Sequence, residues 1–464
     1  MENIPVVGSY AKLFSLAAFT PLEKKAIVRV RWAFLLRSLC MNLHKPAFLS
    51  QLLALCENDA ARMATQIGRA QAVTNAFALL LGPIVSSLSD AVGRPAIAAV
   101  RPLGLALHNI TLALLAPIAT KTGLAPLTVH LIAESLFVGA LGAGGSDVLG
   151  ASMSDLFGSR PVVSSKLQTC DGMSWDVSGL LAPFLGAFIA TRSVTAAFVA
   201  AAVVGGVTAV IVATMPETLK KDKQKPFSLL QANALANVFL MFKSGVGLRR
   251  LAIANTLQQC MYSLHNTIPP YLMGVLQCSI SEVSYFNVAS AFGMLCCQGF
   301  VVGPTLDRLG LFSTYKVGLT GGFAALALQG NSHRGGGGHT RIIVQFLLAQ
   351  AVEDLVYEMC FHTGRSMVVK QGMAECPEAG LGKLNSSFYG LGALTGSVMP
   401  LVWSRLFAMF VSQQHRGGIL GLVGPGGHLL VGSGLMAVAW LVLWSTPADK
   451  LFLEDEKGKG YAAG

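Results

Sequence analysis

Residues 194–214 read VTAAFVAAAVVGGVTAVIVAT, a stretch without a single charged side chain. A helix of about 20 apolar residues, rising 1.5 Å per residue, is long enough to cross the hydrocarbon core of a bilayer. The whole chain has the same character, because 53% of its 464 residues are hydrophobic and 12% are charged. Soluble domains carry about 25% charged residues. The sequence therefore predicts an integral membrane protein.

Hydrophobic runs between polar turns predict an all-α protein with twelve transmembrane helices. The expected spans are 32–53, 66–86, 96–118, 126–150, 167–190, 194–214, 251–272, 282–305, 314–331, 342–363, 383–410 and 425–446. An even number of spans places both termini on one side of the membrane. Most of the 34 Lys and Arg residues lie on that side, so the positive-inside rule makes it the cytoplasmic side. We expect a multi-pass protein of the plasma membrane or an organelle membrane.

The net charge of +11 follows from this topology and from attraction to anionic lipid. We therefore expect the lipid bilayer, and no nucleic acid, as a partner.

The long polar connection at 215–250 divides the spans into two blocks of six. We expect an N-terminal half over 1–214, a cytoplasmic linker over 215–250, and a C-terminal half over 251–464 that ends in a short tail. Several features recur at a constant offset of 217 residues, which predicts an internal duplication into two pseudo-symmetric six-helix bundles. The recurring pairs are Asp90 with Asp307, Gly93 with Gly310, Lys166-Leu167 with Lys383-Leu384, and Gly179-x-x-x-Pro183 with Gly396-x-x-x-Pro400.

The turn between the second and third spans reads SSLSDAVGRP at 86–95, and its copy reads GPTLDRLG at 303–310. Both resemble the G-x-x-x-D-R/K-x-G-R/K signature of the major facilitator superfamily of transporters. PETL at 216–219 is similar to the end of the sixth span in drug-efflux members, and GLLAPFLG at 179–186 resembles a motif of proton antiporters. The resemblance covers essentially the whole chain. It implies the major facilitator fold and a drug-efflux or proton-antiporter branch.

This resemblance implies a gating role for the two turns and a helix-packing role for the fifth-span motif. The aspartates can accept hydrogen bonds at a helix N-terminus, the glycines allow the reversal, and the arginines can pair with acids. The first copy has Ala91 and Pro95 where the pattern has basic residues, so we expect the second copy, which has Asp next to Arg, to matter more. The alternative is an ordinary solvated turn. The gating residues are Asp90, Gly93, Arg94, Gly303, Asp307, Arg308 and Gly310, and the packing residues are Gly179, Pro183, Gly186, Gly396 and Pro400.

Ionisable residues within spans point to a polar cavity, which the resemblance places along spans one, four, seven and ten. Each costs about 2.5–3.5 kcal/mol at the bilayer centre, so it needs a partner or water. Lys45 and Glu134 lie at equal depth, about 12 Å from the outer face, and can form an ion pair that either carries a proton or only joins two helices. Adjacent helical residues point about 100° apart, so at most one of Glu353 and Asp354 faces a narrow cavity. The candidates for the proton and substrate cavity are Lys45, His44, Glu134, Asp176, His265, Glu353 and Asp354.

Other functional classes find little support. NSHRGGGGHT at 331–340 has two histidines without a neighbouring acidic or Cys ligand in the sequence, so we expect an exposed outer loop and no metal site. GALGAGG at 139–145 lies inside a span and has no preceding strand, and no phosphate-binding loop is present. The nine cysteines show no paired metal-ligand spacing, and we expect free thiols and no cofactor.

We therefore expect a monomeric, non-enzymatic secondary transporter that moves a small solute by alternating access. Coupling to protons and an efflux direction follow from the resemblance and the intramembrane acids. The alternatives are a facilitative uniporter, an uptake symporter, or a receptor or scaffold that has the same fold and transports nothing. A cysteine placed at Ser332 and labelled with an impermeant thiol reagent tests the topology of the 331–340 loop.

Overall fold

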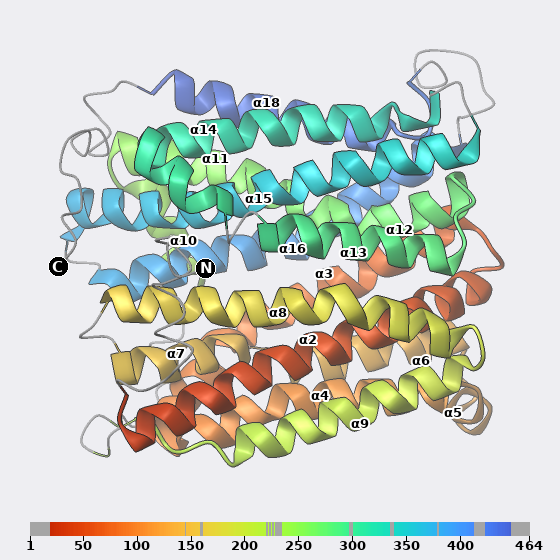
Figure 1. The fold of residues 1–464 in the computed structure, drawn as a ribbon, viewed down its shortest axis with the longest axis horizontal. Helices are drawn as coiled ribbons and strands as arrows, with labels where there is room; N and C mark the ends of the chain where they lie inside the picture. Colours follow the sequence, from red (N-terminus) through yellow and green to blue (C-terminus); the bar gives the residue numbers. More distant parts are fainter. Residues whose placement is uncertain are drawn as a thin grey trace, which may run out of the picture. The chain divides into compact units, whose positions relative to one another are not determined.

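The computed structural model describes residues 19–143, 145–157, 161–219, 221, 224, 227, 234–296, 300–334, 338–377, 380–412 and 423–446, and within these ranges the regular structure is entirely helical (Figure 1). The helices up to the central connection are α2 (Pro21–Leu55), α3 (Ala60–Val92), α4 (Arg94–Ala113), α5 (Leu115–Thr122), α6 (Pro126–Ala133), the π-helix η1 (Glu134–Ala140), α7 (Gly145–Phe157), α8 (Pro161–Ala190) and α9 (Val194–Ala213). Those after it are α10 (Ala234–Lys243), α11 (Val246–Tyr262), η4 (Ser263–Thr267), α12 (Ile268–Pro270), η5 (Tyr271–Val275), α13 (Ile280–Cys296), α14 (Val302–Gly330), η7 (Ser332–Arg334), α15 (His339–Glu375), α16 (Gly380–Ser412) and α18 (Gly427–Trp444).

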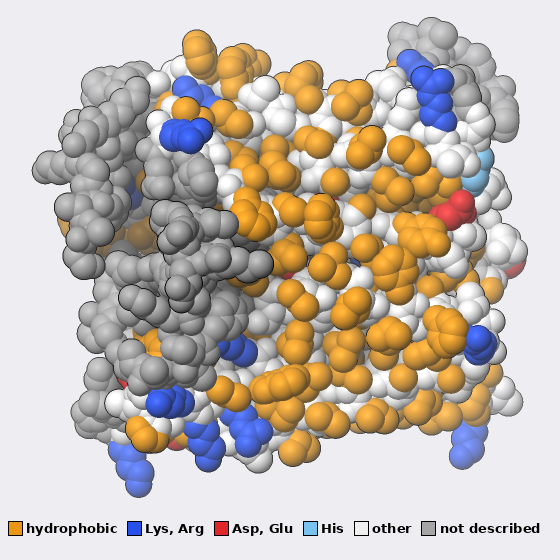
Figure 2. Space-filling model, viewed as in Figure 1, with side chains coloured by type: hydrophobic (Ala, Val, Ile, Leu, Met, Phe, Trp, Pro, Cys, Tyr) orange, Lys and Arg blue, Asp and Glu red, His pale blue; other side chains and the backbone are white. Residues whose placement is uncertain are grey.

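Each of the expected spans coincides with one helix or with a run of short helical segments. Among the described residues, seven helices are long and apolar enough to cross a membrane, and the pair 115–122 and 126–140, bent by 111°, raises that number to eight. Figure 2 shows hydrophobic side chains over much of the face it displays, with Lys and Arg mostly toward the ends of the helices. An all-helical membrane protein is confirmed, and the number of twelve crossings stays a prediction.

The described chain forms two compact units. The first consists of Met1–Phe48 and Leu80–Ala232, and the second of Leu49–Leu79 and Asn233–Gly464. In the first unit α4 packs along α9, and in the second α14 packs against α15 and α18 (Figure 1). The last part of α2 and the first part of α3 thus belong to the second unit. The expected boundaries at 214 and 251 stay a prediction.

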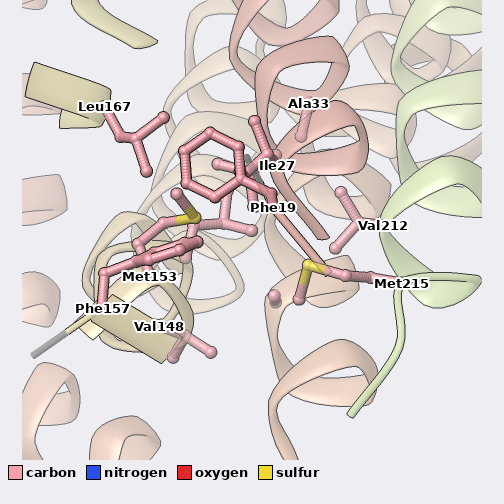
Figure 3. Close-up of a cluster of buried hydrophobic side chains, with 12 residues drawn as sticks. Phe19, Ile27, Ala33, Val148, Met153, Phe157, Leu167, Val212 and Met215 are labelled. Atoms are coloured by element: carbon pink, nitrogen blue, oxygen red, sulfur yellow. The ribbon is translucent and has the colours of Figure 1, made fainter. Parts of the chain in front are cut away.

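One end of the first unit is held by a buried hydrophobic cluster drawn in Figure 3. Phe19 meets Phe157 of α7 edge to face, with ring centroids 5.7 Å apart. Further members come from α2, α7, α8 and α9, and they include Ile27, Met153, Leu167 and Val212 (Figure 3). Ala98 of α4 is also a member and Val85 of α3 packs against it, so the cluster fixes the ends of the helices that carry the 86–95 turn.

The two units repeat one helix crossing at corresponding positions. In the first unit, Gly186 of α8 lies so close to α2 that an added Cβ would collide with the carbonyl oxygen of Leu43. In the second unit, Trp403 of α16 donates a hydrogen bond from Nε1 to the carbonyl oxygen of Cys260 in α11, over 2.7 Å. Both members of the second pair lie 217 residues after those of the first. The offset found in the sequence is therefore also an offset between tertiary contacts.

The predicted packing residues take several positions in these helices. Pro183 lies inside α8, with Gly179 one turn before it, and Pro400 lies inside α16. The carbonyl oxygen of Gly396 accepts a hydrogen bond from Nδ2 of Asn75 over 3.0 Å. At Gly186 and Gly396 the small residue brings two helices together, as small residues do in membranes.

The 331–340 loop is exposed at several described positions, as the sequence predicts, but Ser332 is not one of them. Ser332 is buried, and its hydroxyl donates to the carbonyl oxygen of Gln329 over 2.7 Å. Asn331 and Arg334 are exposed, and residues 335–337 lie outside the described residues. His339 lies 3.3 Å from Oε1 of Glu282, so the fold supplies a carboxylate that is remote in the sequence. Arg334, not Ser332, is therefore the position for a labelling test.

Candidate functional site

The turn at 86–95 depends on a glycine in a conformation that other residues avoid. Gly93 is the only residue between α3 and α4, and its φ is +118°. That region of φ is open to glycine at no steric cost. A Cβ on Gly93 would also collide with Oε2 of Glu217, which follows the end of α9. The PETL segment and the turn are thus in direct contact.

Arg94 is the centre of a charged network at this turn. It is 7% exposed, and its Nε lies 3.0 Å from Oδ2 of Asp155 in α7. Its Nη1 lies 2.6 Å from Oδ1 of Asp90 and donates to Oγ of Ser89 over 2.7 Å. The first copy therefore also has an Asp–Arg pair, although the two residues are not adjacent in the sequence, because the helical turn brings residues 90 and 94 together.

Asp155 and Glu217 belong to this network, although the sequence signature of the turn includes neither of them. The backbone N–H of Arg94 donates to Oε2 of Glu217 over 3.0 Å. Oε1 of Glu217 accepts from the N–H groups of Thr218 and Leu219, and the Thr218 hydroxyl donates to Asp155 over 3.2 Å. The network joins the ends of α3, α4, α7 and α9. Such a network can hold four helix ends in one arrangement, which is what a gate needs in one of its states.

The second copy of the turn is described only in part. The side chains of Gly303 and Asp307 lie outside the described residues. Arg308 is exposed, and Gly310 interrupts α14 with a φ of +73°. Gly310 therefore repeats the backbone role of Gly93. The greater importance of Asp307 stays a prediction.

A cluster of histidines surrounds Glu134 in the first unit. Glu134 begins the π-helix η1, and its Oε2 lies 2.8 Å from Nε2 of His108 in α4. The ring of His44 lies edge to face with that of His108, at 6.0 Å between centroids, and its Nδ1 donates to the carbonyl oxygen of Cys40. The ring of His130 lies 4.9 Å from that of Phe48.

One histidine of this cluster, His130, has no hydrogen-bond partner for its ring among the described residues. Within the described part of the chain, no group of three His, Cys, Asp or Glu side chains could hold a metal ion. His108 and His130 escaped the sequence analysis, because single histidines in apolar runs show no spacing. The pairing of Lys45 with Glu134 stays a prediction.

The second unit also pairs a histidine with an acid, and this acid lies on the span equivalent to that of Glu134. Nε2 of His265 lies 3.3 Å from Oε1 of Glu353 in α15, and its Nδ1 is 3.1 Å from the carbonyl oxygen of Tyr262. Oε2 of Glu353 accepts from Nε2 of Gln329 over 3.0 Å. Asp354 is also buried and accepts from Nε2 of Gln350 over 2.7 Å.

The helix that carries His265 is broken around it. The 3₁₀ segment η4 interrupts the span directly before Pro269 and Pro270, and the π segment η5 follows them. Prolines lack the N–H that an α-helix needs at these positions, so the hydrogen-bond register changes. Glu134 likewise begins a π-helical segment. Such irregular turns are frequent at functional sites.

A small cavity of about 20 Å³, room for about one water molecule, lies beside the His265–Glu353 pair, within the second unit. Its lining comes from α11, η4, α14, α15 and α18, and includes both members of the pair. Tyr262 and Tyr357 stack there, with centroids 5.1 Å apart. Of the two adjacent acids, Glu353 lines this cavity and Asp354 is absent from its lining.

Asp176 in α8 is buried. Its neighbour Trp175 contacts α2. The Arg37 guanidinium lies over the Trp175 ring at 4.8 Å, and the Ser38 hydroxyl donates to the Trp175 carbonyl oxygen over 2.7 Å. These contacts join α2 to α8 at the depth of Asp176. A proton role for Asp176 stays a prediction.

A family model described as Major Facilitator Superfamily matches residues 21–328. The chain belongs to the major facilitator superfamily. A search of curated proteins found no match. As a member of this superfamily, it is a multi-pass membrane protein of a transporter family and not of an enzyme family.

Solved structures of superfamily transporters share its fold. A D-xylose-proton symporter is similar with a TM-score of 0.68 and 13% identity, over 92% of this chain and 99% of that one. The nucleoside transporter NupG, in a mutant form, gives 0.65 and 11%, over 90% and 99%. The human organic anion transporter MFSD10 (TETRAN) gives 0.59 and 18%, over 91% and 100%. At these identities the likeness shows the fold alone.

Proposed function

We propose that this superfamily member is a secondary active transporter that couples the movement of a small solute to protons by alternating access. Its two halves would expose the site to either side of the membrane in turn. Both termini lie in the cytoplasm in this proposal, and the protein works as a monomer. The PETL segment and the fifth-span motif support an efflux direction.

One observation carries the proton coupling. A carbonyl oxygen cannot donate, so Nδ1 of His265 must carry the hydrogen that it gives to Tyr262. The Nε2 lone pair of a neutral His265 then faces Oε1 of Glu353 over 3.3 Å. Two acceptors at this distance repel unless a proton lies between them. The pair therefore holds one proton, either as imidazolium with carboxylate or as imidazole with carboxylic acid.

The exposure of the His265–Glu353 pair allows it to carry a proton as well as to join two helices. His265 is partly exposed, at 27% of its side chain, whereas Glu353 is 8% exposed. The pair can thus exchange its proton with water through the histidine side. The His108–Glu134 contact in the first unit is a second candidate for the same role.

The function is tested by transport in liposomes that contain the purified protein. A panel of labelled amines, organic anions, hexoses, nucleosides and dipeptides is offered with and without a pH gradient. We expect one class to accumulate above equilibrium, and a protonophore to abolish the accumulation. Flux that merely equilibrates, whatever the gradient, would identify a facilitative uniporter.

The residue assignment is tested with Glu353→Gln, which keeps the size of the side chain but cannot titrate. We expect it to lose gradient-driven accumulation while exchange of solute persists, since exchange needs no net proton movement. The matched control is Glu57→Gln, because Glu57 is 78% exposed and pairs with Arg62 outside both clusters. Undiminished accumulation by a well-folded Glu353→Gln protein would remove the pair from the coupling mechanism.

A further inference from the structure

We infer that Lys316 of α14 and the last turn of α18 bind the headgroup of an anionic phospholipid, in the bilayer leaflet on the side of the 303–310 turn. In the proposed orientation this is the cytoplasmic leaflet. The inference goes beyond the proposed function, since it concerns the lipid-facing surface of the second unit and depends on no transport step. It rests on the position of one cation, on its contacts, and on the apolar surface around it.

Two aromatic rings hold the Lys316 ammonium at the end of α18. Its Nζ lies 4.4 Å from the ring centroid of Phe312 and 5.0 Å from that of Trp444. Phe312 precedes Lys316 by one helical turn, so the lysine side chain runs toward the N-terminal end of α14. Trp444 is the last residue of α18. A lysine that extends its alkyl chain along a span in this way places its charge at the membrane surface.

The Lys316 ammonium has no acidic partner among the described residues. Its contacts there are the two aromatic rings, and its Nζ makes no hydrogen bond or ion pair with any described side chain. A cation–π contact attracts the ammonium but leaves its charge and its three N–H donors available. A charge at the edge of the hydrocarbon core needs an opposite charge or water. The phosphate groups of anionic lipids lie at that depth, so the bilayer supplies the counter-charge.

A second cation covers the end of the same helix. Nη1 of Arg250, in α11, donates to the carbonyl oxygen of Ser445 and, over 3.0 Å, to the hydroxyl oxygen of Ser445. Ser445 directly follows Trp444, so Arg250 and Lys316 both lie beside the last turn of α18. The C-terminal end of a helix has a partial negative charge, which repels anions. Arg250 offsets this charge, so that a phosphate can approach the Lys316 ammonium.

Exposed apolar side chains flank this cation and favour a lipid over a soluble anion. Trp444 is 64% exposed, Leu441 56% and Val317 46%. Leu441 lies one turn before Trp444 on α18, and Val317 follows Lys316 on α14. A free phosphate would meet the ammonium and leave this apolar surface bare. A phospholipid covers the surface with its acyl chains while its phosphate meets Lys316, at the level where tryptophans gather in membrane proteins.

The same contacts select an anionic headgroup over a choline headgroup. Trp440 stacks on Trp444 with ring centroids 5.1 Å apart, and the Lys316 ammonium lies over the same Trp444 ring. A trimethylammonium group therefore finds this ring already occupied, and Lys316 and Arg250 both repel it. A glycerol headgroup has no cation, so phosphatidylglycerol keeps the ion pair with Lys316 without the repulsion.

The test measures which lipids stay bound to the purified full-length protein. The protein is equilibrated in mixed micelles with equal amounts of dioleoylphosphatidylglycerol and dioleoylphosphatidylcholine, which share their acyl chains. After washing in detergent, the retained lipids are extracted and quantified by mass spectrometry. We expect phosphatidylglycerol to be enriched about fivefold, the factor that one lysine near an anionic lipid surface contributes. The enrichment should fall as the salt concentration rises. Glycerol 3-phosphate in solution should not displace the retained lipid, because it has no acyl chains to cover the apolar surface.

Variants test the cation and the aromatic ring separately. Lys316→Gln, which removes the charge, should abolish the enrichment of phosphatidylglycerol. The matched control is Lys243→Gln, because Lys243 is exposed at the end of α10 in the same unit and loses the same charge. This control should keep the full enrichment. Trp444→Leu should lower the enrichment about twofold, and Trp444→Phe should retain most of it because an aromatic face remains. Trp444 is exposed, so its variants test the site without disturbing the buried core.

A second measurement follows the thermal unfolding midpoint in each lipid. Phosphatidylglycerol should raise this midpoint for the unchanged protein and not for Lys316→Gln. A midpoint that falls equally in both lipids for Lys316→Gln would instead identify an acid of this chain as the partner of Lys316.

Three further outcomes would overturn the inference: equal retention of the two lipids by the unchanged protein, full enrichment in Lys316→Gln, or displacement of the lipid by glycerol 3-phosphate. All of these outcomes are separate from failure of the proposed function, since gradient-driven flux in liposomes is measured independently of bound lipid.

Discussion

Replacing Arg94 with alanine should destabilise the first unit more than neutralising either of the two acids that the Arg94 side chain contacts. The guanidinium contacts Asp155 from Nε, and Asp90 and Ser89 from Nη1. The bond from the Arg94 backbone N–H to Glu217 survives the substitution. The loss therefore comes from the side chain alone, and its parts can be ranked by the exposure of each partner.

The expected magnitude follows from that ranking. The residue Asp155 is exposed, but its side chain is only 17% exposed, so its contact resembles a hydrogen bond between charged groups with a shielded carboxylate, worth about 2 kcal/mol. The side chain of Asp90 is 39% exposed, and a pair of this kind contributes below about 1 kcal/mol. With the Ser89 bond, we expect Arg94→Ala to cost about 3–4 kcal/mol, Asp155→Asn about 2 kcal/mol, and Asp90→Asn less than about 1 kcal/mol.

The assay is the free energy of unfolding of purified protein, from SDS titration in mixed micelles. A double-mutant cycle of Arg94→Ala with Asp155→Asn should give a coupling energy of about 2 kcal/mol. A coupling energy near zero would refute the network, as would an Asp90→Asn variant that costs as much as Asp155→Asn. Either result would return the turn to an ordinary solvated loop.

Two further predictions concern topology and packing. Arg334→Cys in intact cells or sealed right-side-out vesicles should react with an impermeant maleimide, because Arg334 is exposed. The native Cys278 thiol should add little background labelling, because burial raises its pKa to about 12. Protection of the new thiol from the reagent would reverse the proposed orientation. Gly186→Ala should destabilise the protein by about 1–3 kcal/mol, because its Cβ meets the Leu43 backbone. Gly206→Ala, which meets open space in α9, should be neutral or stabilise by up to about 1 kcal/mol; equal unfolding midpoints for the two variants would contradict the close crossing of α8 and α2.

Hydrophobicity and periodic duplication determined the fold class from the sequence. A run such as 194–214 has no folded environment other than lipid or a buried core, and its backbone must satisfy its hydrogen bonds within one helix. The offset of 217 residues linked Gly93 to Gly310, and both take a positive φ. The family followed from the same short signatures, because glycine and aspartate at a turn have narrow physical roles.

The contacts of the site were decided by the tertiary structure. Nothing in the sequence placed Asp155 and Glu217 around Arg94, since they are 61 and 123 residues away along the chain. The same holds for His108 beside Glu134, because a lone histidine in an apolar helix has no pattern that names its neighbour.

The choice between Glu353 and Asp354 shows most clearly what the sequence determined and what the tertiary structure decided. Their spacing determined that at most one could face a narrow cavity, because adjacent helical residues point about 100° apart. Which one does so depends on the rotation of α15 against its neighbours. Packing against α11, α13, α14 and α16 turns Glu353 toward His265 and the cavity, and places Asp354 beside Gln350. Helix rotation is set by side-chain packing between distant segments, and a local sequence pattern contains no information about it.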